Sequence, residues 1–433
     1  MLRIVCLLAV LLLLFGCTDQ GTSPSNEPAD QPPDRREPPA SYAESDQIAL
    51  SVDAGLCAAN LEFALNSFRE IVAGEPEDKN VFYSPLSLTI ALAMAYNGAK
   101  GQTAEVMAEA MGIEAMTLEE ANQEFSDLTL CLQNCDSALV LNIANSMWVD
   151  EVYPIAATFR NNLVYYYFAD VFRMLLNSQA AVDSINGWVE LHTNGKITEM
   201  VDLNLVQNAV LMLIDALYFN AQWTFRFEED STKDKPFYPP GGETLTVQMM
   251  ENSGRDFTYH YDSNFKAVRM PYGRNIAAMY VFLPEYDSNV GDFIAALNSD
   301  EWTEWMGSFD SLETYWGEYA EEHSFNFPRF RMEYEKMLNE VLTALGMGII
   351  FTPASDFTGI TGTTAHDPWV EFVKQKAFIE VNEAGTEAAA ATIIAFEEGV
   401  PPSFIVDKPF FFIIRDDRSG SILFMGRITR PEY

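Results

Sequence analysis

The sequence predicts a mixed α+β domain, because two kinds of apolar pattern alternate along it and nothing divides it. Apolar side chains at helical spacing occur in four segments: 55–73, 155–168, 182–192 and 334–345. Short continuous apolar runs, typical of strands buried on both faces, occur in three: 139–149, 209–219 and 276–283. No repeat and no Pro/Gly-rich linker interrupts residues 51–433, so we expect one domain there.

Two further elements have clear boundary signals. Ser84 and Pro85 open a helix as cap and first-turn residue, and its apolar run stops near Gly98. Near the C-terminus, β-rich runs at 409–414 and 422–428 flank the polar segment 416–420. This pattern predicts a β-hairpin.

The N-terminus reads as a targeting segment. Arg3 precedes an apolar run from Ile4 to Phe15, too short to span a bilayer. The run ends Leu14-Phe15-Gly16-Cys17, which resembles a bacterial lipobox, so we expect a lipoprotein signal over residues 1–17 and a lipid on Cys17. The alternative is an ordinary signal peptide that contains a chance cysteine. Either way the sequence predicts an extracytoplasmic protein, secreted or held at the cell membrane.

Residues 18–50 are expected to be a disordered tether. They contain six prolines and few apolar side chains, too few to offset the entropy of ordering. Nothing in residues 18–49 is expected to join the core, and the folded domain is expected at 51–433.

Charge restricts the possible partners. The chain has 26 basic and 63 acidic residues, a net charge of −37 and a pI near 4.2. Nucleic acid and anionic membrane surfaces are therefore not expected to bind it. A solvated surface explains the acidity, and a saline habitat is a second explanation. Membrane contact is expected only through the N-terminal lipid.

Catalytic and metal-binding motifs are missing from the sequence. The four histidines are far apart, and there is no HExxH, CxxC, GxSxG or Gly-rich phosphate loop. Beyond the targeting segment the cysteines are odd in number, so no complete disulfide framework forms: Cys57, Cys131 and Cys135. We therefore expect no enzymatic activity, no bound metal and no cofactor. The three thiols are expected to be buried or unreactive.

One segment, 382–402, has an unusual pattern with period two. From Thr386 to Phe396, residues at even positions carry no charge and no proline, and none is bulky before Ile394. Laid out as a strand, this set places one face in a tight core. The run of alanines also suits a helix, which is a reasonable alternative for a loop at rest.

This segment resembles the serpin hinge, which reads Glu, any residue, Gly-Thr-Glu and then small residues. The matching residues are Glu383, Gly385, Thr386, Glu387, Ala388, Ala389, Ala390, Ala391 and Thr392. Other serpin-like segments occur in family order, among them 80–103, 141–149, 185–197, 210–223, 325–330, 356–360, 408–416 and 423–431. The resemblance covers about 380 residues.

The resemblance implies a fold with three β-sheets, eight or nine helices and an exposed reactive loop. It also implies a suicide inhibitor: a serine protease attacks the loop, forms a covalent acyl complex, and is trapped when the cut loop inserts as a strand. No cofactor is implied, and a monomer is expected. The alternatives are a non-inhibitory serpin or an inhibitor of a cysteine protease.

The family pattern also implies a sheet-opening region, made of Ser84, Asn186, Gln375, Trp223 and Arg329. Gln375 stands where the family usually has histidine, and it can hydrogen-bond to Ser84 or Asn186 but cannot become charged. Glu383 is expected to pair with Arg329 near Trp223.

The cleaved bond is predicted less sharply, at Glu398, Gly399 and Val400. Counting along the loop from Gly385, as the family does, places the bond after Gly399. Counting back from Pro401-Pro402 places it after Glu398, and Phe396 is a third candidate. The first two choices imply a protease that prefers a small residue or glutamate.

Overall fold

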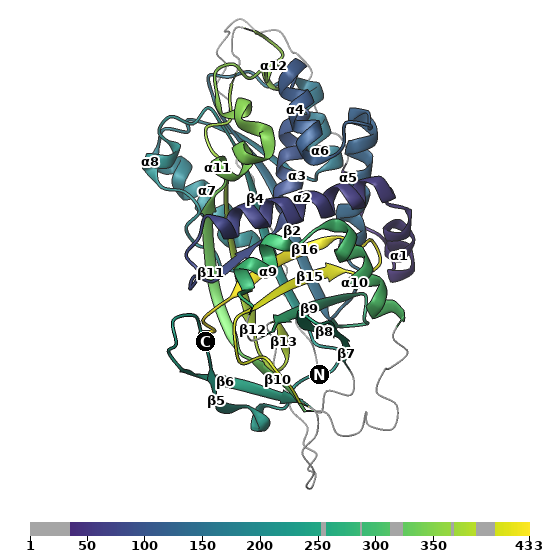
Figure 1. Ribbon diagram of the computed structural model, residues 1–433. Coiled ribbons are helices and arrows are strands. Elements are labelled where there is room, and N and C mark those ends of the chain that lie inside the picture. The colour runs from purple at the N-terminus through teal and green to yellow at the C-terminus, as the bar shows by residue number, and fades with distance from the viewer. Residues whose placement is uncertain (1–34, 253–256, 286–287, 312–323, 365–367, 387–402) are drawn as a thin grey trace, which may run out of the picture. The chain divides into compact units, whose positions relative to one another are not determined.

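The computed structural model describes residues 35–252, 257–285, 288–311, 324–364, 368–386 and 403–433 (Figure 1). Residues 33–433 form one compact unit. The described helices of eight or more residues are α1 Tyr42–Ser51, α2 Ala54–Ala73, α3 Pro85–Tyr96, α4 Gly101–Met111, α5 Leu118–Leu132, α6 Ala157–Tyr166, α7 Gln179–His192 and α10 Ser299–Ser311. The shorter ones are α8 Leu203–Val206, α9 Val290–Ala296, α11 Asn339–Leu342 and α12 Thr358–Thr361.

The largest sheet has six strands in the order β1-β16-β15-β9-β8-β7, and every pairing in it is antiparallel. Its strands are β1 Val81–Tyr83, β7 Thr258–Tyr261, β8 Phe265–Tyr272, β9 Ala277–Pro284, β15 Phe410–Asp416 and β16 Ile422–Ile428. The last two form the hairpin predicted at the C-terminus. Strand β9 is buried along its whole length, as its continuous apolar run predicts.

Three smaller sheets complete the fold. One runs β14-β10-β6-β5, one runs β13-β4-β2-β3, and β11 pairs with β12 alone. Their strands are β2 Leu139–Asp150, β3 Asp170–Met174, β4 Leu211–Gln222, β5 Lys233–Phe237, β6 Leu245–Asn252, β10 Ser324–Pro328, β11 Phe330–Met337, β12 Lys374–Val381, β13 Gly385–Thr386 and β14 Ser403–Ile405.

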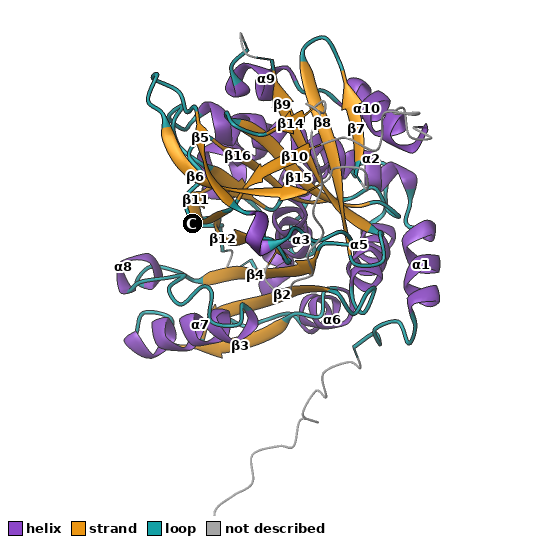
Figure 2. Cartoon of the chain, turned by 90° about the horizontal axis from the view of Figure 1, so that it is seen from below, coloured by secondary structure: helices purple, strands orange, loops and turns teal. Residues whose placement is uncertain are grey.

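Helix α3 lies between two sheets and packs against both β4 and β16 (Figure 2). It begins as predicted, with the Ser84 hydroxyl accepting from the Ser87 amide at 3.2 Å and Pro85 in the first turn. Strand β4 alternates between two cores. Leu217, Phe219 and Ala221 join the main core on the α3 side, whereas Met212, Ile214 and Ala216 join a second core that includes α7.

The α+β class is confirmed, but the counts differ from the expected three sheets and eight or nine helices. Twelve α-helices occur in the described part of the chain, three of them only four residues long. Four hydrogen-bonded sheets are described, because β12 pairs with β11 and does not form a ladder with β4.

The prediction of a helix over 334–345 was wrong for its first residues. Strand β11 continues to Met337, and helix α11 starts only at Asn339. Along β11 the fully buried side chains are Phe330 and Tyr334, four residues apart as on a helix face. Pairing with β12 over the whole strand decides the outcome instead.

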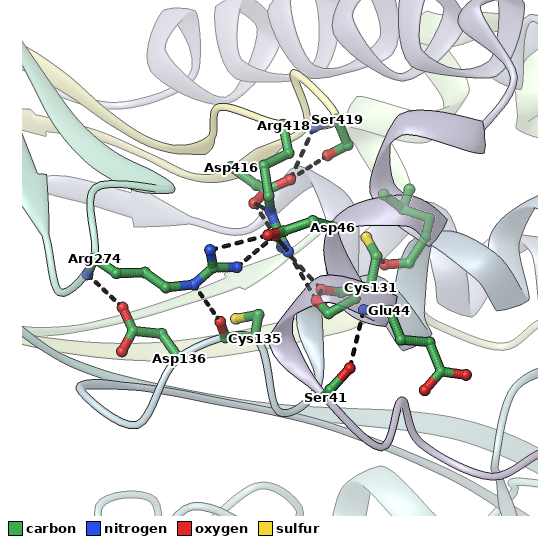
Figure 3. Close-up of polar contacts among 12 residues, drawn as sticks. Ser41, Glu44, Asp46, Cys131, Cys135, Asp136, Arg274, Asp416, Arg418 and Ser419 are labelled. Atoms are coloured by element: carbon green, nitrogen blue, oxygen red, sulfur yellow. Dashed lines mark hydrogen bonds and ion pairs between the residues drawn. The ribbon is translucent and has the colours of Figure 1, made fainter.

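The expectation that nothing in residues 18–49 joins the core was also wrong. Helix α1 packs against α5 and buries Ser45 and Ala49. Asp46 pairs with Arg274 and, at 3.0 Å, with Arg418 (Figure 3). The helix is held by small residues and ion pairs and has no apolar stripe. Since an apolar stripe is the pattern by which a packed helix is recognised in a sequence, this helix was missed. The signal, Cys17 and the tether up to residue 34 lie outside the described residues.

The described residues contain no group of three or more His, Cys, Asp or Glu side chains that could hold a metal ion. Within the same residues no single helix is long and apolar enough to cross a membrane, although the bent pair α1 and α2 meets that criterion when taken together.

Candidate functional site

The candidate site is the seam between β4 and β12. The two strands lie near each other. One edge of β4 pairs with β2 along the length from Leu211 to Ala221. On its other edge, within the described residues, only Gly385 and Thr386 pair with it. Among the described residues, most backbone groups on that edge of β4 therefore have no strand partner, as on an edge strand.

The turn after β12 points the chain into this seam. Asn382 and Gly385 exchange backbone hydrogen bonds of 2.9 and 3.2 Å. Gly385 has a φ of +151°, and a Cβ built there would lie 2.1 Å from the carbonyl oxygen of Ala221. Only glycine fits this approach. After the turn, Gly385 and Thr386 pair antiparallel with Gln222 and Ala221, as the first two residues of a strand between β4 and β12.

One end of the seam, called its upper end below, is where β13 pairs with the last residues of β4, and it is built around Trp223. Its indole Nε1 donates to the carbonyl of Asn382 at 2.9 Å, and its backbone amide donates to the carbonyl of Ala384 at 3.0 Å. The ring stacks on Tyr272 with centroids 4.4 Å apart. Trp223 thus ties the end of β4 to the turn that leads into the hinge.

The expected ion pair between Glu383 and Arg329 is present. Arg329 Nε lies 3.3 Å from Glu383 Oε2, although without hydrogen-bond geometry. Glu383 is only 4% exposed, and its other oxygen accepts from the hydroxyl of Thr232. The guanidinium of Arg329 also bonds Gln248 and lies over the ring of Tyr433.

Thr386 is the only inward hinge residue that the structure describes. It is 2% exposed, and its Oγ1 lies 2.9 Å from the hydroxyl of Tyr272. The expected inward direction of the even positions is therefore confirmed at this residue. The rest of the predicted hinge and cleavage site, from Glu387 and Ala388, Ala389, Ala390, Ala391 and Thr392 to Glu398, Gly399 and Val400, lies outside the described residues.

Lower in the seam, Gln375 holds β12 against the start of α3. Its Oε1 accepts from the Ser84 amide at 2.8 Å, and its Nε2 donates to the Ser84 carbonyl at 3.0 Å. The Ser84 hydroxyl in turn donates to the carbonyl of Leu423 on β16 at 2.7 Å. Gln375 was expected to hydrogen-bond to Ser84 or Asn186, and in the structure it bonds to Ser84.

Asn186 is not part of this group, which corrects its inclusion in the sheet-opening region. It lies on α7, on the other face of β4. Its carboxamide bonds the backbone of Met200 and Val201, with distances from 2.8 to 3.0 Å. Its role is to fix the chain segment that follows α7, because its side-chain hydrogen bonds in the described structure go there.

Sequence reasoning missed two residues of the seam, Ser87 and Asp215. The Ser87 hydroxyl donates to Asp215 Oδ1 and accepts a long 3.4 Å bond from Gln375 Nε2. Ser87 thereby links β4 to β12 through α3. The available signal was Asp215 itself, the only charged residue in the apolar run 209–219.

The three cysteines of the domain are free thiols. Burial raises the pKa of Cys57 and of Cys135 to about 11, and burial also raises the pKa of Cys131. The thiolate is the reactive form, so these side chains are poorly suited to nucleophilic chemistry.

This arrangement defines a class of protein: a β-sheet with an open seam and a chain segment already registered at its upper end. The sequence profile described as Serpin (serine protease inhibitor) matches residues 58–431. A leukocyte elastase inhibitor from Sus scrofa is 34% identical over 387 residues, covering 87% of this chain and 99% of the relative. The chain belongs to the serpin family.

Two other comparisons agree with this assignment. An uncharacterized serpin-like protein from Methanosarcina acetivorans is 33% identical over 408 residues, covering 91% of this chain and 92% of the relative. The crystal structure of the thermophilic serpin tengpin in the native state matches with a TM-score of 0.77 and 26% identity, covering 88% of this chain and 95% of that one. At the level of the family, serpins are protease inhibitors and not catalysts.

Proposed function

We propose that this serpin is a suicide inhibitor of a serine protease outside the cytoplasm. The protease attacks the loop between Gly385 and Pro402 and forms an acyl-enzyme. The cut loop then inserts between β4 and β12 and carries the protease with it. The protein acts as a monomer, needs no cofactor, and contacts the membrane only through its N-terminal lipid.

The observation that carries this proposal is the register of β13. Gly385 pairs with Gln222 and Thr386 with Ala221. Continued downward, that register would bring Ala388 opposite Phe219, Ala390 opposite Leu217 and Thr392 opposite Asp215 in the inserted product. Directly opposite residues share a face, and these β4 side chains face α3 and the main core. Small loop residues would thus meet large core residues, and the polar Thr392 would meet the one carboxyl group.

The same pattern disfavours the non-inhibitory alternative. A scaffold that does not insert its loop has no need for small, uncharged inward residues. Here the inward positions from Thr386 to Thr392 carry no charge, no proline and no bulky side chain. A charge there would cost several kcal/mol when buried without a partner.

Residues at the predicted cleavage site limit the choice of protease. Gly399 suits a protease with a small primary pocket, of the kind that elastases have, and Glu398 suits a glutamate-preferring one. The relatives named leukocyte elastase inhibitors support the first choice. A cysteine protease trapped by the same loop insertion is the second candidate.

The test is to incubate the folded body with a panel of serine and cysteine proteases and to look for a covalent adduct that survives SDS. Mass spectrometry of the released C-terminal peptide then identifies the cut bond. We expect an adduct with a serine protease that cuts after Glu398 or Gly399. Cleavage by every protease in the panel without any adduct would favour the non-inhibitory alternative.

The location has its own test. Expressed in a bacterial host that makes lipoproteins, the full chain should partition with the membrane, whereas Cys17→Ser should be released as soluble inhibitor. Metabolic labelling with a fatty-acid analogue should mark the first protein only. Labelling of both proteins, or of neither, would contradict lipidation at Cys17.

A further inference from the structure

A carboxyl group lies at the middle of the seam with one oxygen unsatisfied. Asp215 Oδ1 accepts from the hydroxyl of Ser87, which is 2% exposed. Asp215 as a residue is half-buried, but its Oδ2 is closed to solvent and has no hydrogen-bond partner among the described residues. A buried carboxylate oxygen without a donor is costly, so its protonation state matters here.

A second unsatisfied acceptor lies directly across the sheet. Asn145 on β2 is the register partner of Asp215 on β4. Opposite residues of an antiparallel pair share a face and have Cβ atoms about 4.5–5.5 Å apart. Asn145 is 3% exposed, and its Oδ1 also has no hydrogen-bond partner within the described part of the chain.

The orientation of the Asn145 amide is fixed by its other end. Its Nδ2 donates to the carbonyl of Tyr167 at 3.0 Å. Turning the amide over would lose that bond and would bring two oxygens together. Oδ1 of Asn145 and Oδ2 of Asp215 are therefore two acceptors on the same face. A proton on Asp215 turns one of them into a donor.

Among the described residues, no charged side chain bonds to Asp215. The other charged or titratable side chains on β4 and the elements around it are Tyr218 on β4 itself, Tyr96 on α3, Asp150 on β2, Lys374, Lys376 and Glu380 on β12, Asp183, Glu190 and His192 on α7, and Arg427 on β16. Among the described contacts, none of them bonds to Asp215. Lys374 and Lys376 instead donate to the carbonyls of Met200 and Glu199. Burial raises the pKa of Asp215 to about 7, against a smaller lowering by the Ser87 hydrogen bond.

We propose that Asp215 is a positioning residue for strand insertion, whose neutral acid form donates to Asn145 and, through Ser87, ties β4 to Gln375 on the far side of the seam. When Asp215 ionises, Oδ2 and the Asn145 oxygen repel each other, and separating the strands lets water reach the charge. The closed seam is then less stable. This inference goes beyond the proposed inhibition, because it holds whichever protease is the target.

The direction of the pH effect follows from the raised pKa. The native state holds a proton that the unfolded chain, with its ordinary carboxyl pKa, has lost. The stabilisation is complete below a pH of about 4 and is lost as the pH rises through about 7. The seam should therefore open more readily in mildly alkaline solution than in mildly acidic solution.

The test compares the full-length protein with Asp215→Asn, whose amide donates to Asn145 and stays neutral. The measured quantity is the rate at which native protein is lost at a fixed elevated temperature. Between a pH of about 5.5 and 8.5 the wild-type rate should rise at least about tenfold more than the rate of the variant. The ratio of the two rates should have its midpoint near pH 7. Since both proteins share every other acid, the ratio isolates this one proton.

Two further measurements guard against a purely structural effect. At a pH of about 6, the infrared spectrum of wild type minus Asp215→Asn should show the carbonyl stretch of a protonated acid, which disappears in alkali. Ser87→Ala removes the hydrogen bond that favours ionisation, so it should move the midpoint to higher pH. Asp150→Asn, the same chemical change at the end of β2, should leave the midpoint in place.

The contrary results are equally specific. Parallel pH profiles for wild type and Asp215→Asn would overturn the proposal, as would the absence of the protonated-acid band. If Asp215→Asn fails to fold, the wild-type pH difference spectrum and the shift in Ser87→Ala still decide the matter. A wild-type midpoint below a pH of about 5 would also contradict it.

Discussion

Glu383 and Arg329 form an ion pair beside the hinge, at the end of the β11–β12 ladder, with 3.3 Å between Oε2 and Nε. Glu383 and Ala384 form the turn between Asn382 and Gly385, and the carboxylate of Glu383 is almost completely buried. Its own backbone carbonyl accepts from the amide of Phe227 at 2.9 Å. The turn that precedes β13 is therefore anchored through both backbone and side chain.

Arg329→Gln should loosen this anchor. The change removes the charge opposite Glu383 but keeps a group that can bond Gln248, so the buried carboxylate loses its cation. We expect the free energy of unfolding to fall by about 1–3 kcal/mol, because a buried carboxylate that loses its nearby cation pays part of its desolvation penalty uncompensated. A thermal melt of both proteins measures it.

A double-mutant cycle with Glu383→Gln provides the control. If the two side chains interact, the second substitution should cost less in the Arg329→Gln background than in wild type. Additive effects would show that the 3.3 Å approach contributes no stability.

Thr386→Arg should convert the inhibitor into a substrate. Thr386 is buried against Tyr272, so an arginine there blocks entry to the seam and costs several kcal/mol if it is forced inside. Glu387→Arg is the matched control, because residue 387 is expected to point outward. The stoichiometry of inhibition, measured by titrating a trapped protease, should rise at least about tenfold for the first variant only. Trapping that survives Thr386→Arg would mean that the inward face is misassigned.

Resemblance to the serpin family predicted the hinge, but not the close approach of Gly385 to Ala221, which is far away in the sequence. Local patterns predicted much of the fold: Ser84 and Pro85 start α3, and the apolar run over 209–219 becomes β4. Both depend on neighbours in the chain, a cap in one case and a continuous buried strand in the other. Such features are readable without any tertiary information.

The misses depend on residues that are far apart in the sequence. Helix α1 docks because Arg274 and Arg418 reach Asp46 from more than 200 positions away, and no local pattern encodes that. Asp215 faces Asn145 only because of the β2–β4 register. Asn186 was placed by family pattern in the wrong layer, since the helix that carries it packs on the outer face of β4.

Acid should weaken the attachment of β11 through Glu75. Burial raises the pKa of this carboxyl, but hydrogen bonds from Lys336, Lys79 and Tyr334 together outweigh burial and hold it at about 2. Because the pKa is depressed, the stabilisation is complete above the ordinary value near 4.5 and is lost as the pH falls through about 2. Glu75→Gln should cost about 1–2 kcal/mol at neutral pH, allowing for solvent screening, and almost nothing at pH 2.

Urea midpoints of wild type and Glu75→Gln across this pH range provide the measurement. Glu77→Gln is a suitable control, because Glu77 lies two residues away and no described ion pair includes it. A cost that stays constant down to pH 2 would contradict the depressed pKa of Glu75.

Cutting the loop should make the protein more stable to heat. On the edge of β4 that faces β12, the described residues supply strand partners only at Gln222 and Ala221, through β13. Each further ladder bond contributes about 1 kcal/mol net, so a released strand that fills the seam adds substantially to the stability of the sheet. An ordinary protein that is nicked in a surface loop keeps or loses stability, because a nick adds no contacts. The sign of the change therefore separates the two cases.

Thermal melts of intact protein and of protein cut once between Gly385 and Pro402 measure this change. The control is the Thr386→Arg variant cut in the same way, because its loop cannot insert. We expect the midpoint to rise for wild type and to stay unchanged or fall for the variant, whereas an unchanged midpoint for cut wild type would favour a serpin that does not insert its loop.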